Sequence, residues 1–155
     1  MKPFEPARKL ISAGALILDA IGRVLIVKPT YKDGWEIPGG IVEAAESPLA
    51  ACRRELCEEL GIDVSVGRPL CVEYRSAGAI DSLQWVFDGG MLSPDQIAQV
   101  ALPPHELSAY EFVPIGDLAG LLPEVLVVRL QVAHKARERG TTAYIENGLV
   151  VAPND

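Results

Sequence analysis

The sequence has few aromatic residues, few cysteines and no long apolar run. Aromatic residues make up 6% of the 155 residues, three residues are cysteine, and no stretch of about 18 apolar residues occurs. The lack of a long apolar run excludes a membrane-spanning helix, and the cysteine count argues against a disulfide framework. With 49% hydrophobic and 23% charged residues, the composition is that of a globular protein, and the length fits one domain, residues 1–155.

The three cysteines are odd in number and lack the CxxC or other spacings of zinc sites. We therefore expect Cys52, Cys57 and Cys71 to be small buried thiols in a reducing compartment. The first 20 residues are interrupted by acidic side chains and contain no apolar core of signal-peptide quality. These features predict a cytoplasmic protein.

Excess negative charge narrows the range of partners. The 14 basic and 21 acidic residues give a net charge of −7. Proteins bind nucleic acid backbones by placing Lys and Arg against phosphates, so generic binding to a nucleic acid polymer is disfavoured. If the substrate is an anion, a metal ion or a few placed basic side chains must compensate its charge locally.

The N-terminal third contains the signals of three short strands. Two runs rich in Ile, Val, Leu and Ala, residues 9–18 and 24–28, are separated by a turn-like DAIG and predict a β-hairpin. A third short strand is expected within WEIPGG, residues 35–40, where a proline and two glycines stop it.

A helix over residues 48–60 is the clearest local signal. Ser47 is a favourable N-cap, Pro48 occupies the first helical position, and Gly61 stands just past the end. Farther along, residues 93–114 have the character of a loop, and a second helix is expected from about Asp117 to the basic HKARERG. Strands are predicted at residues 64–74, 82–87 and 110–113, with a hairpin at 143–151. This order indicates an α/β domain in which a mixed sheet lies between helical layers.

The first helix concentrates carboxylates on one face. Glu55, Glu58 and Glu59 project together, whereas the apolar residues of the helix line another face. Each like-charge pair costs roughly 0.2–0.5 kcal/mol, and Arg54 offsets only part of this repulsion. A hard divalent cation such as Mg²⁺ would resolve it, because Mg²⁺ takes carboxylate oxygens, water and the phosphate oxygens of a substrate. The alternative is a solvated acidic face without a function.

The spacing around these glutamates resembles the Nudix box. Gly40 is followed after five residues by Glu46, and after seven more by RELCEELGI, residues 54–62. This pattern is similar at every defined position to the signature of hydrolases that act on a nucleoside diphosphate linked to another group. The resemblance implies a Nudix-like α/β/α sandwich with a mixed central sheet over about residues 8–140, followed by a C-terminal extension at 141–155.

The resemblance also implies a set of metal ligands. Glu55, Glu58 and Glu59 match the metal-binding glutamates of the family, and a backbone carbonyl of Gly39 or Gly40 is the expected further ligand. Mg²⁺ is the expected cofactor, and Mn²⁺ is an alternative. The cation would neutralise the phosphates, hold them in line and make its coordinated water a better nucleophile.

Two further residues of the box have an expected supporting role. Glu46 and Arg54 should form an ion pair that fixes the loop against the helix. Ala45 departs from the pattern of many relatives, which carry glycine there, and this difference bears on the geometry of the loop.

The general base is left open between two residues. Glu58 of the helix is one candidate, and Glu106, on a loop bounded by prolines, is the other. Glu111 ranks behind Glu106, because its expected place in a strand is more typical of a surface residue.

The substrate is also left open. The implied reaction is attack of water on a phosphorus of a diphosphate bridge, and a nucleoside triphosphate and a nucleotide sugar both remain candidates. Sequence marks of the ADP-ribose, dinucleoside polyphosphate, NADH and coenzyme A subfamilies are missing. A non-catalytic nucleotide-binding or regulatory module and an isomerase of isoprenoid diphosphates are the alternative functions. The family resemblance favours a homodimer.

Overall fold

Eight strands and three α-helices occur within residues 1–152, the part of the chain that the computed structural model describes. The strands are β1 (Leu10–Leu18), β2 (Val24–Pro29), β3 (Gly39–Ile41), β4 (Pro69–Arg75), β5 (Ser82–Met91), β6 (Leu107–Val113), β7 (Ala143–Glu146) and β8 (Leu149–Val150). The helices are α1 (Pro48–Leu60), α2 (Pro94–Ala98) and α3 (Glu124–Arg139), and a 3₁₀ turn, η1 (Ile115–Asp117), precedes α3. None of these helices is long and apolar enough to cross a membrane.

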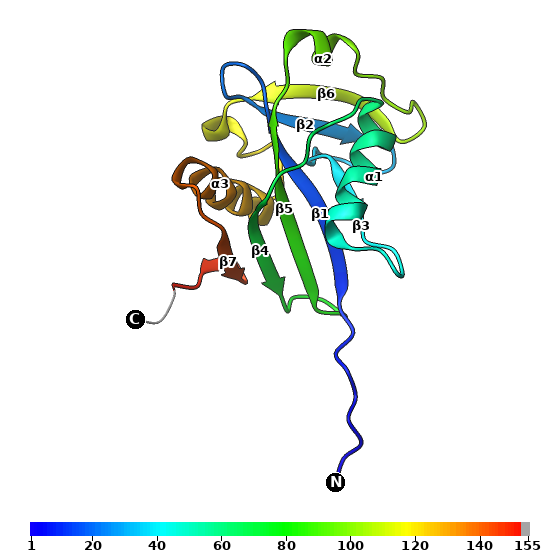
Figure 1. Cartoon of the computed structure of the whole chain (residues 1–155), viewed down its shortest axis with the longest axis vertical. Coiled ribbons are helices and arrows are strands. Elements are labelled where there is room, and N and C mark those ends of the chain that lie inside the picture. The colour runs from blue at the N-terminus through cyan, green and yellow to red at the C-terminus, as the bar shows by residue number, and fades with distance from the viewer. Residues whose placement is uncertain (153–155) are drawn as a thin grey trace.

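The strands form one mixed sheet with a helix on each face. Their order is β6-β2-β1-β5-β4-β7-β8, and β3 pairs with β1. The pairs β1–β5 and β4–β7 are parallel, and the others are antiparallel. Helix α1 lies on one face and α3 on the other (Figure 1). The predicted α/β/α sandwich with a mixed central sheet is confirmed.

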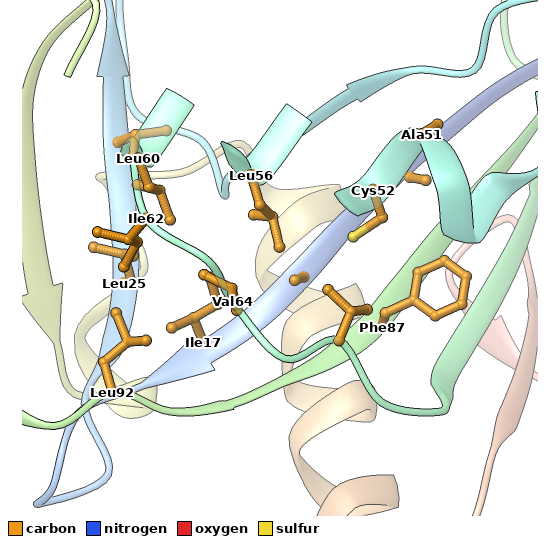
Figure 2. Close-up of a cluster of buried hydrophobic side chains, with 14 of the residues drawn as sticks. Ile17, Leu25, Ala51, Cys52, Leu56, Leu60, Ile62, Val64, Phe87 and Leu92 are labelled. Carbon is orange, nitrogen blue, oxygen red and sulfur yellow. The ribbon is translucent and has the colours of Figure 1, made fainter. Parts of the chain in front are cut away.

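Alternating side chains of β1 contribute to two separate cores. Ala15 and Ile17 face α1, whereas Leu16 and Leu18 face α3, as the period of two along a strand requires. Figure 2 shows the core under α1, where Leu56 points toward the side chains of the sheet. Both faces of β1 are therefore buried over residues 15–18, and the strand belongs to both cores.

The ends of α1 are formed as predicted. The Ser47 hydroxyl accepts a hydrogen bond from the backbone N–H of Ala50 at 3.1 Å, and Pro48 is the first helical residue. Gly61 adopts a left-handed conformation with φ of 64°, and its N–H donates to the Cys57 carbonyl at 3.0 Å. These local caps set which residues enter the helix and hence which side its glutamates face.

The third strand lies later than predicted. In WEIPGG, Glu36 forms only an isolated bridge with Val27, and the ladder with β1 begins at Gly39. A Cβ atom on Gly39 would lie 2.4 Å from the carbonyl oxygen of Ala13, so only glycine allows the two backbones to come this close. The glycines therefore begin the strand and do not stop it.

Two strands differ in extent from the prediction. The strand expected at residues 64–74 begins only at Pro69. Two buried valines precede it in a segment outside the ladder, so their alternation imitates a strand without its hydrogen bonds. The strand expected at 82–87 continues to Met91, because β1 pairs with it that far across an irregularity.

The segment expected as a loop, residues 93–114, contains a short helix and a longer strand than predicted. Helix α2 begins with a capping box in which Ser93 accepts from the Gln96 N–H at 3.2 Å and the Gln96 side chain accepts from the Ser93 N–H at 2.9 Å. This local signal was overlooked. Strand β6 begins at Leu107, where it is already paired with Pro29 of β2.

The second long helix begins later than expected. Asp117 ends the 3₁₀ turn, and α3 begins only at Glu124. Gly120 between them has φ of 84°, and Pro123 is extended with ψ of 141°, so the backbone cannot continue as a helix through this stretch. Apolar residues continue at helical spacing through both η1 and α3, so the sequence pattern alone predicted one uninterrupted helix.

Two of the three cysteines and the C-terminal hairpin agree with the prediction. Cys52 and Cys71 are buried as expected, but Cys57 is exposed, because five residues after Cys52 it lies on the opposite side of α1. The predicted hairpin at 143–151 is present as β7 and β8, with β7 parallel to β4. Residues 153–155 of the expected C-terminal extension lie outside the described residues.

Replacement of a core leucine of α3 tests how much the second core contributes. Leu130 is fully buried, so Leu130→Ala should lower the free energy of unfolding by about 2–5 kcal/mol. Val125→Ala in the same helix is the control, because that side chain is 41% exposed. Urea unfolding followed by circular dichroism measures both, and equal losses would contradict this packing.

Candidate active site

The glycine pair of β3 touches two of the three carboxylates of α1. The Gly39 N–H donates a hydrogen bond to Glu59 Oε2 at 3.1 Å. A Cβ atom on Gly40 would lie 2.4 Å from the carboxyl carbon of Glu55, so that carboxylate rests directly on the glycine backbone. Strand β3 and helix α1, which the chain connects through a short loop, therefore form one contiguous group.

Arg54 organises the acidic group from one side. Its Nε donates to Glu46 Oε1 at 2.8 Å and its Nη2 to Glu46 Oε2 at 3.0 Å, which is the expected ion pair in bidentate form. Its Nη1 donates to Glu55 Oε1 at 2.7 Å and lies 3.5 Å from Glu58 Oε2. One guanidinium thus contacts three carboxylates and fixes the loop before α1 to the helix.

The loop between β3 and α1 bends at Ala45, which has φ of 62°. This is the left-handed region that glycine adopts without strain, so the departure from glycine at this position is tolerated at some cost in backbone energy. The bend allows Glu46 to turn back, where its Oε2 also accepts from the Glu43 N–H at 3.0 Å. The hydrogen bonds from Arg54 and Glu43 lower the pKa of Glu46 to about 2.

The three carboxylates of α1 differ in their surroundings. The side chain of Glu58 is 56% exposed and that of Glu55 18%, whereas Glu59 is buried. Burial is the main cause that raises the pKa of Glu59 to about 8, and the charges of Glu55, Glu36 and Glu106 act in the same direction, against the lowering effect of the Gly39 N–H. Glu59 is thus a buried carboxyl group for which a nearby positive charge would be favourable.

The chemistry of this donor group fits a hard cation, although its side chains are not arranged as a ligand set. Among residues 1–152, no three His, Cys, Asp or Glu side chains are grouped in a way that could hold a metal ion. Arg54 engages Glu55, and Glu58 extends toward solvent. Carboxylate oxygens and backbone carbonyls are nevertheless the ligands that Mg²⁺ takes, and within the described residues Glu59 has only the Gly39 N–H as a hydrogen-bond partner. A cation would therefore require Glu55 and Glu58 to turn toward Glu59.

The two candidate bases outside the box occupy different places. Glu106 is exposed in the turn before β6, and its carbonyl accepts from the Thr30 N–H at 2.9 Å, which ties this turn to the end of β2. Its charge contributes to the raised pKa of Glu59, so it lies near the acidic group. Glu111 is exposed within β6 opposite Ile26. The structure thus brings Glu106 toward the site.

A cleft of about 350 Å³ adjoins the glycine pair. It is bounded by β1, β3, β5, the segment before β3 and helix α3. Sequence reasoning overlooked its polar lining, which comprises Ser12, Tyr31, Lys32, Glu36, Gln84 and Arg129. Tyr31, Lys32 and Glu36 come from one short segment, in which Lys32 and Glu36 form an ion pair at 2.6 Å. The other three side chains come from β1, β5 and α3, so no local motif connects the whole group.

Comparison with known proteins assigns this arrangement to a family. The model of the NUDIX domain matches residues 8–134. The chain belongs to the Nudix family. The predicted family is therefore confirmed, and the matched region contains the glycine pair, α1 and the cleft-lining strands.

Individual relatives of this Nudix protein agree with the assignment. A CTP pyrophosphohydrolase of Escherichia coli is 35% identical over 115 residues, which are 68% of this chain and 85% of the relative. An RNA pyrophosphohydrolase of Hydrogenovibrio crunogenus is 31% identical over 64% of this chain and 68% of its own. The MutT protein of Methanosarcina mazei has the same fold, with a TM-score of 0.69 at 24% identity over 88% of this chain and 99% of its own. The expected enzyme class, a Nudix-type pyrophosphohydrolase, is confirmed.

Alanine at each glycine of the pair should have different effects. In Gly39→Ala the new Cβ meets backbone atoms of β1, so we expect a loss of stability of about 1–3 kcal/mol. In Gly40→Ala it meets only the flexible end of Glu55, so the fold should persist while diphosphate hydrolysis falls. Thermal melts and activity assays on both variants check this, and equal melting temperatures would contradict it.

The ion pair of Glu46 predicts a pH-dependent contribution to stability. Because the folded pKa, about 2, lies below the ordinary value of 4.5, the contribution is present above pH 4.5 and is lost as the pH falls toward 2. The difference in urea midpoint between the wild type and Glu46→Gln should therefore be larger at pH 6 than at pH 3. Glu5→Gln in the exposed N-terminal segment is the control, and a difference that does not change with pH would refute the prediction.

Proposed function

We propose that this Nudix protein is a metal-dependent hydrolase that cleaves the diphosphate bridge of nucleoside triphosphates. The observation that carries the proposal is the contact of Gly39 and Gly40 with Glu59 and Glu55 at the edge of the cleft. This contact puts oxygen donors for a cation beside a space that can accept the rest of a nucleotide. The relative from Escherichia coli, a CTP pyrophosphohydrolase that matches along most of its length, supports a triphosphate over a nucleotide sugar.

The proposed ligands are Glu55, Glu58, Glu59 and the backbone carbonyl of Gly40. Mg²⁺ is the expected cation, and Mn²⁺ suits the same oxygen donors. When bound, the cation supplies neutralisation of phosphate charge and a lowered pKa of water. The protein contributes a rigid backbone at the glycine pair, and Arg54 prevents the neighbouring carboxylates from drifting apart. Arg54 and Glu46 are thus positioning residues in this proposal.

Two carboxylates can take the proton from the attacking water. Glu58 is exposed on α1 and its contact with Arg54 is a long one of 3.5 Å, so its side chain is free to turn. Glu106 comes from a different element, the turn before β6, and its charge contributes to the raised pKa of Glu59. Replacement of each by glutamine in the assay below identifies the base, since only loss of the base should abolish the ascending limb of the pH–rate profile.

Release of nucleoside monophosphate, or of pyrophosphate in the case of RNA, from a panel of substrates tests the function. The panel contains nucleoside triphosphates, nucleotide sugars, ADP-ribose, dinucleoside polyphosphates and an RNA with a 5′-triphosphate, each with Mg²⁺ and with chelator. Glu59→Gln should lower kcat/KM for triphosphates roughly 100-fold or more, because a carboxylate that would hold the charge-neutralising cation is lost. Glu124→Gln, at the start of α3, should leave it unchanged.

The same panel contains the outcomes that overturn the proposal. Turnover that persists in chelator would exclude the metal-dependent reaction. A folded protein that binds Mg²⁺ but turns over none of the substrates would instead favour a nucleotide-binding or regulatory module.

A further inference from the structure

Three polar side chains form a row across the α3 face of the sheet. Ser12 of β1 pairs in register with Gln84 of β5, which pairs in turn with Glu73 of β4, so all three point to the α3 face. The Gln84 amide is held on both sides, since its oxygen accepts from the Ser12 hydroxyl and its nitrogen donates to Ser82 at 3.1 Å. Ser12 and Gln84 form part of the wall of the cleft.

Glu73, at one end of this row, binds two arginines. It is 1% exposed, and its Oε2 accepts from Arg129 Nε at 2.6 Å. Its Oε1 accepts from Arg75 Nη1 at 3.2 Å and from the Gly148 N–H of the C-terminal hairpin at 2.9 Å. One carboxylate thus faces two guanidinium groups, so this group of three side chains carries a net positive charge.

Arg129 lines the cleft and has donors that Glu73 does not use. Its side chain is only 10% exposed. Within residues 1–152, neither of its terminal nitrogens makes a hydrogen bond, and the only fully buried side-chain nitrogen or oxygen without a partner is Nε1 of Trp85. The terminal nitrogens therefore keep access to the cleft, and Glu73 holds the plane of the guanidinium fixed.

We propose that Arg129 selects the nucleobase of the substrate, by donating two parallel hydrogen bonds to a base edge that has two adjacent acceptors. Cytosine has such an edge at O2 and N3, and guanine has one at O6 and N7. Adenine places an amino donor beside each ring acceptor of its corresponding edges, and a guanidinium, which only donates, cannot pair with that donor. The proposal rests on the function proposed above, which puts the diphosphate at Gly40 and the base deeper in the same cleft.

Paired variants separate this role from a structural one. Arg129→Lys keeps a positive charge beside Glu73 but removes the planar fork. Arg75→Lys makes the same change at the other arginine of Glu73, which does not line the cleft. If Arg129→Lys does not fold, the double variant Arg129→Gln with Glu73→Gln removes both charges of the buried pair together. Thermal melts establish which variants are folded.

Two measurements read out base selection. Calorimetric titration with CMP, GMP and AMP, without a cation, measures binding independently of turnover, and kcat/KM is measured for CTP, GTP and ATP. We expect the wild type to favour CMP, GMP or both over AMP by roughly 5- to 150-fold, the usual discrimination of a bidentate contact. The Arg129 variant should lose this preference with little change for AMP or ATP, and Arg75→Lys should keep it.

Three results would overturn the inference. Equal affinity of the wild type for all three monophosphates would exclude base selection. An equal loss for all three in the Arg129 variant would place the guanidinium on the phosphate or ribose, and the same loss in Arg75→Lys would make the effect structural. Base-selective binding without turnover would refute only the proposed function, and cation-dependent turnover without base preference only this inference.

Discussion

The close approach of the Gly39–Gly40 backbone to β1 on one side and to α1 on the other is the constraint on which the active site depends. A side chain at Gly39 would collide with the backbone of β1, and one at Gly40 with the Glu55 carboxylate. The pair therefore seats the helix on the sheet and provides Glu59 with its hydrogen bond. The same close packing of the glycine pair therefore places the acidic group and allows β3 to pair with β1.

The two faces of the sheet have different tasks. On the face of α1, an apolar core supports the helix (Figure 2), and Glu55 and Glu59 of the same helix contact the glycine pair of β3. On the face of α3, the apolar core stops short of one end of β1, β4 and β5, and polar side chains line the cleft there. Because β3 borders both regions, chemistry at the diphosphate and recognition of the attached group can occur on opposite sides of one short strand.

Both regions use a guanidinium held by carboxylates, with opposite consequences. Arg54 is surrounded by Glu46, Glu55 and Glu58, so its charge is more than compensated and a cation remains favourable nearby. Glu73 is flanked by Arg75 and Arg129, so its charge is more than compensated and this group carries a net positive charge. Bidentate or fixed pairing restricts the side chains in both places, which is the usual means of keeping polar groups ready for a ligand.

Local sequence alone determined α1, its caps and the spacing of Glu46, Arg54 and the three helical glutamates, because helical periodicity and capping act within a few residues. It also determined the family, whose signature lies almost entirely in that segment. Tertiary structure decided that Glu59 is buried while Glu58 is exposed, and that Arg129 reaches Glu73. These features arise from the register of strands far apart in the chain and from the packing of helices on them, which no local pattern encodes.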